Sequence, residues 1–306
     1  NEGFYGELPP GSDYLIMGHE SIGIVEEAGK NVQDLKVGDY VTRTVRRPCL
    51  ENTCENCPSE LDFCSTGKYT ETGIKGLHGI MTEYYADQPK YLVKVPKEFA
   101  NVGVLMEPLS FAEKAVTQSY LVQKKRMRWW PQKALVFGAG PIGLLETMIL
   151  RSRGLDVDVV ARSRTGFKSY LAENIGAKYI SIQDIETLGK YDLVIESSGS
   201  PQCIELALNC TKPNGVVCLT SVTSGSGMTV IPLEKINLDM VLGNRTIIGA
   251  VNASINDYKM GLDDIVRFER NWPGVLGHLI TQRLKPNQYK AAFEHRKEDI
   301  KTVIEF

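Results

Sequence analysis

The sequence predicts an α/β protein in which a doubly wound parallel sheet is joined to a second, β-rich domain. Two observations predict the sheet: apolar strand-like runs alternate with helix-like segments between Ala134 and Val251, and a glycine-rich motif joins the first run to the first helix. A third observation predicts the other domain, because residues 1–108 are rich in Gly, Pro and short β-like runs. The 306 residues suffice for about two domains, each with its own core.

Composition excludes several classes of protein. Hydrophobic residues make up 42% of the chain, and 35 basic side chains nearly balance 37 acidic ones, so the net charge is −2. This balance argues against intrinsic disorder and against binding to DNA or RNA. No apolar run approaches the roughly 18 residues that span a bilayer, so we expect no membrane insertion. Because the chain lacks an initiator Met, we interpret it as a fragment or a processed form.

The order of the expected elements follows from the apolar pattern. Residues 1–108 contain three candidate strands, and a helix-compatible stretch follows them at Leu109–Arg126. After this stretch, strands and helices alternate. The candidate strands are Ile22–Glu26, Tyr40–Val45, Tyr91–Val95, Ala134–Phe137, Val157–Ala161, Tyr179–Ile182, Leu193–Glu196, Val216–Thr220 and Thr246–Val251, and the helices are Pro141–Arg153, Phe167–Ile175 and Pro201–Cys210.

A glycine loop predicts a dinucleotide site. Gly138-Ala-Gly140-Pro141-Ile142-Gly143 lies between a buried strand and an apolar helix, where the first glycine permits a tight turn, the second lets a pyrophosphate approach, and the third lets helix and strand pack closely. The helix N-terminus then faces the anion. The alternatives are an ordinary glycine-rich turn and an S-adenosylmethionine enzyme. We expect a dinucleotide-binding domain at 109–252, with residues 253–306 returning to the first domain.

The end of the second strand of this region selects the cofactor. An NAD site needs an Asp or Glu there to bind the ribose 2′-hydroxyl. This chain has Arg162, Ser163 and Arg164 instead, and guanidinium and hydroxyl groups bind a 2′-phosphate. The sequence therefore favours NADP over NAD. The alternative is that these arginines only solvate a surface turn.

Four cysteines fall within sixteen positions and predict a structural zinc site. Tetrahedral zinc favours four thiolates in closed sites. The competing interpretations are two disulfides or an iron–sulfur cluster. Three later cysteines, Cys203, Cys210 and Cys218, have apolar neighbours and are expected to be buried packing residues. The uneven distribution favours a reducing, cytoplasmic compartment. The zinc candidates are Cys49, Cys54, Cys57 and Cys64.

A second metal candidate is Gly18-His19-Glu20-Ser-Ile-Gly23. An imidazole beside a carboxylate, followed by glycines, suits an open catalytic zinc site. Taken alone, a His-Glu pair is more often a surface polar pair. It does not occur alone here, because a thiolate cluster and a dinucleotide loop follow it.

Together, the GHExxG segment, the four-cysteine lobe and the GxGxxG loop resemble the zinc-dependent medium-chain dehydrogenase/reductase superfamily over essentially the whole chain. Within it, several segments resemble the glucose 1-dehydrogenase branch, as do the arginines after the second strand. These segments are Thr44-Val-Arg46-Arg47-Pro48, Phe63-Cys-Ser-Thr-Gly67, Met106-Glu-Pro-Leu109 and Ile248-Gly-Ala-Val-Asn252.

The resemblance implies a GroES-like catalytic domain, a Rossmann domain and a homo-oligomer (tetramer or dimer). It also implies oxidation of β-D-glucose to the 1,5-lactone with NAD(P). By position, His19 matches a zinc ligand, Glu20 a direct or supporting group beside it, and Glu107 a third residue that binds zinc or sugar. Glu71 and Asn252 match residues that hold sugar hydroxyls, and Asn252 is also expected beside the cofactor.

Two departures from the family pattern affect these expectations. The lobe cysteines have a first gap of four residues and a last gap of six, where the family has two and seven. The family's first catalytic zinc ligand, and its proton-relay Thr or Ser, would precede Asn1, so we expect an incomplete site that binds NADP but oxidises glucose poorly. The alternatives are a NAD-linked zinc polyol or alcohol dehydrogenase, a zinc-free quinone reductase relative, and a non-catalytic NADP-binding protein.

Overall fold

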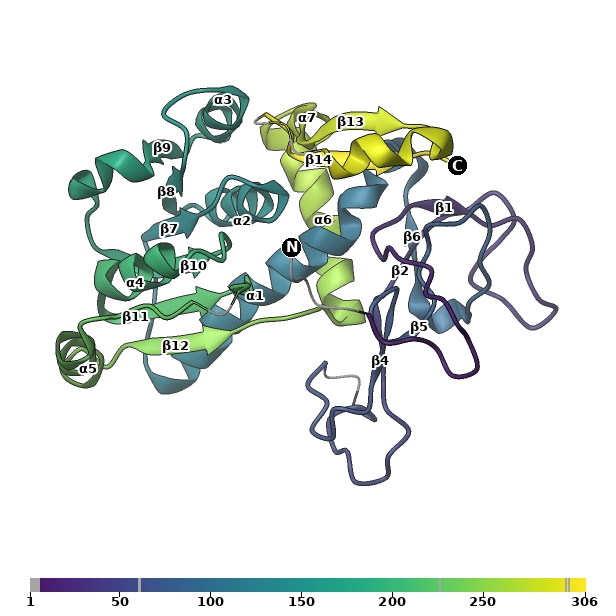
Figure 1. The fold of residues 1–306 in the computed structure, drawn as a ribbon, viewed down its shortest axis with the longest axis horizontal. Helices are drawn as coiled ribbons and strands as arrows, with labels where there is room; N and C mark the ends of the chain where they lie inside the picture. The colour runs from purple at the N-terminus through teal and green to yellow at the C-terminus, as the bar shows by residue number, and fades with distance from the viewer. Residues whose placement is uncertain (1–5, 60–61, 226, 295, 297) are drawn as a thin grey trace.

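The computed structural model describes residues 6–59, 62–225, 227–294, 296 and 298–306. Its largest sheet has six strands, all parallel, in the order β12-β11-β10-β7-β8-β9 (Figure 1). The predicted α/β class is thus confirmed. The strand order reverses between β7 and β10, which is where open parallel sheets bind ligands. The strands are β7 (Lys133–Phe137), β8 (Asp156–Ala161), β9 (Lys178–Ser181), β10 (Tyr191–Glu196), β11 (Thr211–Leu219) and β12 (Thr246–Gly249).

Both faces of this sheet are buried. Ala134 and Val136 of β7 belong to one apolar core, shared with helices α1 and α2, whereas Leu135 and Phe137 belong to a second core, shared with α4. Because alternate residues of a strand point to opposite faces, an unbroken apolar run is what a strand covered on both sides requires.

The helices agree with the predicted ranges at most ends. Helix α1 begins at Met106, three residues before the predicted start at Leu109, because the 3-10 turn Gly103–Leu105 leads directly into it. Strand β11 also begins early, at Thr211 instead of Val216, because the chain becomes extended directly after α4. The helices are α1 (Met106–Arg126), α2 (Pro141–Ser152), α3 (Phe167–Asn174), α4 (Pro201–Cys210), α5 (Leu233–Leu242), α6 (Ile255–Asn271) and α7 (Val275–Leu279).

The N-terminal region contains two three-stranded sheets with short strands. The three predicted strands are present but shorter. Strand β6 begins at Leu92 instead of Tyr91, because Pro89–Tyr91 forms a 3-10 turn. One sheet consists of β1 (Gly23–Ile24), β2 (Tyr40–Arg43) and β6 (Leu92–Val95), and the other of β3 (Arg46–Arg47), β4 (Thr70–Thr72) and β5 (Gly76–Leu77).

The C-terminal segment contacts both parts of the molecule. Helix α6 packs against α1, and the parallel pair β13 (Ile280–Leu284) and β14 (Lys301–Ile304) follows it (Figure 1). Arg283 donates to the carbonyl of Asn101 at 2.7 Å, and Lys301 contacts Glu20. The domain boundaries at 108 and 252 stay predictions. None of the described helices has the length and apolar character that crossing a bilayer requires.

Candidate active site and metal centres

The structure brings His19, Glu20 and Glu107 together. One donor atom from each side chain lies within 4.8 Å of the others. His19 and Glu20 lie in the loop before β1, whereas Glu107 is the second residue of α1, so two distant segments form the cluster. An imidazole nitrogen and carboxylate oxygens are donors that catalytic zinc sites use. The residues present therefore fit a zinc ion.

Close backbone packing holds the loop that carries His19. Gly18 has φ = 87°, a left-handed conformation that favours glycine. A methyl group on Gly73 would lie 2.5 Å from the Gly18 carbonyl oxygen, and one on Gly79 would lie 2.3 Å from that of Met17. Only glycine permits this approach, so the segment 73–79 fixes the backbone before His19. The sequence pattern gave no sign of this support.

Burial dominates the electrostatics of the cluster. It raises the pKa of the Glu107 carboxyl to about 8, and together with the charge of Lys301 it lowers the pKa of His19. The side chain of Lys301 of β14 is half-buried, its desolvation lowers its pKa to about 8, and its ammonium group contacts the Glu20 carboxylate. A neutral imidazole and the desolvated carboxylate of Glu107 can bind a divalent cation, whose charge would stabilise the ionised form of Glu107. Sequence reasoning did not find Lys301.

The four lobe cysteines also come together after β3. All four are free thiols, and their sulfurs lie within 4.8 Å of one another, with 4.0 Å between Cys54 and Cys64. Four sulfurs bound at about 2.3 Å to one tetrahedral ion lie about 3.8 Å apart. The cluster therefore fits a single zinc ion, and the two-disulfide interpretation does not agree with these separations.

Two of the lobe thiols have strongly shifted pKa values, in opposite directions. Donation from the Ser65 hydroxyl lowers the pKa of Cys54 to about 5, whereas burial raises the pKa of Cys57 to about 12. A bound metal ion would stabilise the thiolate form of all four, because its charge balances theirs. The four side chains are therefore better suited to bind a metal ion as thiolates than to remain together as metal-free thiols.

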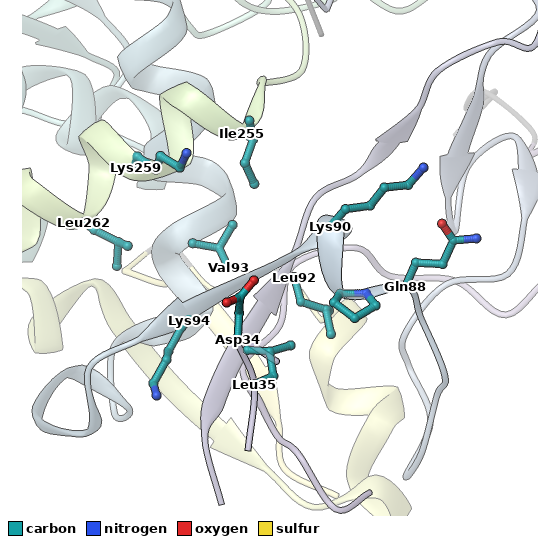
Figure 2. Close-up of a pocket in the computed structure, with 11 residues that line it drawn as sticks. Asp34, Leu35, Gln88, Lys90, Leu92, Val93, Lys94, Ile255, Lys259 and Leu262 are labelled. Atoms are coloured by element: carbon teal, nitrogen blue, oxygen red, sulfur yellow. The ribbon is translucent and has the colours of Figure 1, made fainter. Parts of the chain in front are cut away.

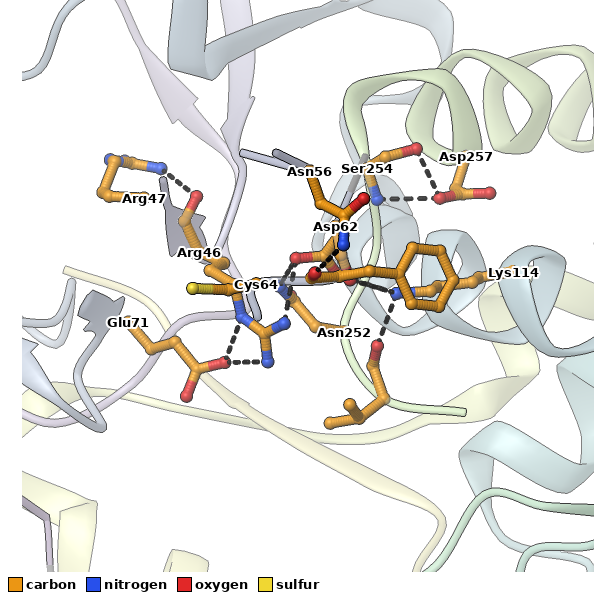
Figure 3. Close-up of polar contacts among 12 residues, drawn as sticks. Arg46, Arg47, Asn56, Asp62, Cys64, Glu71, Lys114, Asn252, Ser254 and Asp257 are labelled. Carbon is orange, nitrogen blue, oxygen red and sulfur yellow. Dashed lines mark hydrogen bonds and ion pairs between the residues drawn. The ribbon is translucent and has the colours of Figure 1, made fainter. Parts of the chain in front are cut away.

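Glu71 and Asn252 are linked by other side chains (Figure 3). The Arg46 guanidinium donates to Glu71 Oε1 at 2.8 and 3.0 Å and to Asp62 Oδ1 at 3.1 Å. Asn252 Nδ2 donates to the same Asp62 oxygen at 3.1 Å, and Lys114 Nζ donates to Asp62 Oδ2 at 2.7 Å. Asp62 therefore joins the two predicted sugar contacts into one buried polar network.

Sequence reasoning missed three members of this network. Arg46 lies in a segment that carries the family resemblance, but that resemblance assigned it no role. Asp62 lies two residues before Cys64, and Lys114 lies seven residues after Glu107 on α1. Residues seven apart share a helix face and lie about 10 Å apart along its axis. Helix α1 thus links the network to the metal cluster, a relation that no local motif encodes.

The glycine loop has the backbone geometry that its motif predicts. Gly138 has φ = 113°, and a methyl group on Gly143 would lie 2.0 Å from the Gly138 carbonyl oxygen. At Gly140 a methyl group would meet nothing within 4 Å. Pro141 and Ile142 form the first turn of α2, so the N-terminus of this helix faces the open space beside Gly140.

Of the three residues after β8, Arg162 and Arg164 are exposed and Ser163 is half-buried. Arg164 pairs with Asp184 at 3.1 Å and donates to Gln183, and the Ser163 hydroxyl lies 3.0 Å from that of Tyr179. Arg162 is exposed, and its charge contributes to lowering the pKa of Lys168, after the larger effect of burial. The surface after β8 is therefore cationic, although Arg164 is paired with Asp184.

Two cavities lie outside the metal cluster. One, of about 750 Å³, lies between β6 and α6, and another, of about 280 Å³, lies beside the cysteine lobe. Neither is lined by His19, Glu20 or Glu107. Figure 2 shows the first, which is lined by Asp34, Leu35, Gln88, Pro89, Lys90, Leu92, Val93, Lys94, Ile255, Lys259 and Leu262.

A doubly wound nucleotide-binding sheet and a β-rich domain with two candidate metal centres together define the class of medium-chain dehydrogenases. Comparison with known families agrees: residues 2–97 match the alcohol dehydrogenase GroES-like domain, and residues 100–306 match the glucose dehydrogenase C-terminus. The chain belongs to the glucose dehydrogenase family of the medium-chain dehydrogenase/reductase superfamily.

Individual relatives support this assignment. The chain is 40% identical to a glucose 1-dehydrogenase of Methanocella arvoryzae, over 100% of the chain and 87% of the relative. It is 42% identical to glucose 1-dehydrogenase 1 of Caldivirga maquilingensis, over 99% and 85%. Among solved structures, Haloferax mediterranei glucose dehydrogenase in complex with NADP, Zn and gluconolactone matches with a TM-score of 0.88 and 31% identity, over 98% of this chain and 85% of that one.

Proposed function

We propose that this protein is a zinc-dependent glucose 1-dehydrogenase that oxidises D-glucose at C1, with NADP, and less readily NAD, as hydride acceptor. The observation that carries the proposal is the convergence of His19, Glu20 and Glu107 in a member of the glucose dehydrogenase family. In this reaction C1 loses a hydride and its hydroxyl loses a proton, so the products are the lactone, NADPH and a proton.

The residues of the cluster would hold the metal. When bound, zinc would polarise the C1 oxygen and lower the pKa of its hydroxyl, and the nicotinamide would take up the hydride. His19 and Glu107 offer donors from two distant segments of the chain, and Lys301 neutralises part of the charge on Glu20. This arrangement supports Glu20 as a direct or supporting ligand.

Sugar and cofactor would be oriented by residues around this cluster. Glu71 and Asn252 are proposed to bind sugar hydroxyls, with Asn252 also near the cofactor. Gly138, Gly140 and Gly143 would receive the pyrophosphate.

Arg162, Ser163 and Arg164 would bind the 2′-phosphate of NADP. The double variant Arg162→Ala, Arg164→Ala should therefore raise the KM for NADP roughly 10-fold or more. The KM for NAD, which has no 2′-phosphate, should stay nearly unchanged.

We also propose that the protein is a homo-oligomer, a dimer or tetramer, that works in a reducing, cytoplasmic environment. Strand β12 is an edge of the six-stranded sheet, and Ile247 on it is exposed, as are Leu238, Val241 and Leu242 on the adjacent α5. Exposed apolar side chains beside an unpaired sheet edge are typical of subunit interfaces. The free thiols of the lobe support the reducing environment.

Replacing His19 with Ala tests the proposed function. In the full-length protein, the variant should lose one of two bound zinc ions and at least about 100-fold in kcat/KM for glucose, while NADP affinity stays within about twofold. His278→Ala is the matched control, because His278 is exposed on α7 and lies outside the cluster. Full glucose oxidation and full zinc content in the His19 variant would contradict the proposal.

A further inference from the structure

A single carboxylate lies at the centre of the network in Figure 3. The Asp62 side chain is 8% exposed, and its two oxygens accept from Arg46, Asn252 and Lys114. The side chains of Arg46 and Lys114 are 9% and 4% exposed. Two buried cations therefore depend on this carboxylate, with Glu71 balancing the second charge through Arg46. In a buried network every polar group needs a hydrogen-bond partner, so these side chains are held in one arrangement.

Asn252 is the member of the network with a buried polar atom that has no partner among the described residues. It is 8% exposed, and its Nδ2 donates to Asp62, but its Oδ1 is buried with no hydrogen-bond partner among the described residues. A buried amide oxygen without a donor is unfavourable, by about 1–3 kcal/mol. Because the bond to Asp62 fixes which end of the amide is the donor, the free acceptor has one defined direction.

The backbone on both sides of Asn252 is also held. Lys114 Nζ donates to the Val251 carbonyl at 2.7 Å, and Ser254 forms the N-terminal cap of α6 with Asp257 at 2.6 and 2.7 Å (Figure 3). Asn252 itself has φ = 58°, in the left-handed region. The structure therefore holds an uncommon backbone conformation and one amide orientation at the same residue, which is typical of a functional site.

We propose that Asp62 is a positioning residue: it orients the Asn252 amide so that Oδ1 accepts a hydrogen bond from a sugar hydroxyl. The inference rests on the proposed function and deepens it by adding a residue of the cysteine lobe to sugar recognition. The group that bonds to Asn252 Oδ1 must be an O–H or N–H donor. A carboxamide of the nicotinamide could supply it as well as the sugar, and the experiment separates the two sources.

Asp62→Asn in the full-length protein is the first test. The amide keeps the shape of the side chain but removes the charge that Arg46 and Lys114 share. We expect the KM for glucose to rise about 10-fold, with kcat within threefold, NADP affinity within twofold and zinc content unchanged. Lys114→Gln, which frees Asp62 Oδ2 and the Val251 carbonyl, should shift the same constants in the same direction and provides a test if Asp62→Asn folds poorly.

A double-mutant cycle shows whether Asp62 acts through Asn252. Glycine tolerates φ = 58°, so Asn252→Gly removes the amide without backbone strain. In that background Asp62→Asn should leave the KM for glucose unchanged, because the group that it orients is gone. Lys68→Gln is the control, since it breaks an exposed ion pair with Glu51 in the same lobe and should not alter either KM.

Three outcomes would overturn the inference. One is an unchanged KM for glucose in Asp62→Asn, and another is a full additional loss in the Asn252→Gly background. A third is a rise in the KM for NADP alone, which would assign the Asn252 acceptor to the cofactor. A full-length wild-type protein that binds two zinc ions and NADP but does not oxidise glucose would overturn the proposed function itself, and the inference with it.

Discussion

Gly140 and Gly143 lie three residues apart in the loop that joins β7 to α2, but a methyl group would meet different surroundings at each. At Gly140 it would meet nothing within 4 Å, whereas at Gly143 it would overlap the Gly138 carbonyl at 2.0 Å. The fold therefore does not need a glycine at position 140, but it does need one at position 143. A pyrophosphate needs the open space beside Gly140.

This difference predicts two separate effects. Gly140→Ala should melt like the wild type and lose roughly 10-fold or more in NADP affinity, measured by fluorescence titration. Gly143→Ala should lower the free energy of unfolding by more than about 2 kcal/mol, because the helix must move away from the strand. Equal stability of both variants would contradict the steric argument.

Glu146 of α2 is a fully buried acid that the proposed reaction does not use. Burial raises its pKa to about 8, although the Ser197 hydroxyl donates to it. Because the folded state binds the proton more tightly than the unfolded chain, the contribution of this group to stability is complete below about pH 4.5. It is then lost as the pH rises through about 8.

Glu146→Gln should remove this pH dependence. The free energy of unfolding of the variant, relative to the wild type, should increase by up to about 1.4 kcal/mol per pH unit between pH 5 and 8, measured by urea denaturation. Exposed Glu186→Gln should follow the wild type at every pH. A constant difference between Glu146→Gln and wild type across this range would show that Glu146 is ionised throughout.

At the scale of elements, α1 connects most of the molecule: it packs against α6, α2 and β11 and carries both Glu107 and Lys114. Gly261 of α6 faces it, and a methyl group there would lie 3.4 Å from Leu109 Cγ and Met106 Cε, an ordinary contact distance. A single methyl group at position 261 would therefore fit between α1 and α6 without overlap.

Gly261→Ala should therefore stabilise the α1–α6 pair. Alanine favours helix and adds one contact, so we expect the free energy of unfolding to rise by about 0.5–1 kcal/mol. Gly261→Leu is the paired control and should lower it by more than about 1 kcal/mol, because the larger side chain forces the helices apart. Chemical denaturation of both variants measures the difference, and a loss of stability in Gly261→Ala would contradict the packing.

For the whole molecule, the cysteine lobe joins a metal centre to the rest of the fold through Asp62. Cys54→Ser should release one zinc equivalent and lower the melting temperature by at least about 5 °C, because structural zinc contributes folding free energy. Cys203→Ala, a buried cysteine of α4 outside the lobe, should keep full zinc content. Metal analysis and thermal melts measure both, and zinc retained in full by Cys54→Ser would exclude the lobe as its site.

Much of this protein was predictable from short stretches of sequence. The apolar run Ala134–Phe137 predicts a strand buried on both faces, the glycine spacing predicts the turn at Gly138, and the cysteine spacing predicts a thiol cluster. Each depends on residues close along the chain, where backbone geometry and side-chain period allow few arrangements. The predicted set His19, Glu20 and Glu107 relied on the family resemblance, and its zinc-binding role stays a proposal.

The tertiary structure decided the rest. Asp62 and Asn252 are 190 positions apart and meet only because α1 and the chain after β12 approach the lobe. Lys301 reaches Glu20 only because β14 packs beside the first domain, and Gly73 and Gly79 matter only because they pack against residues 17 and 18. The sequence by itself determined the strands of the parallel sheet, the helices α1 to α4 and the local motifs, since these depend on local geometry. Contacts between distant segments depend on how the elements pack, which no local pattern specifies.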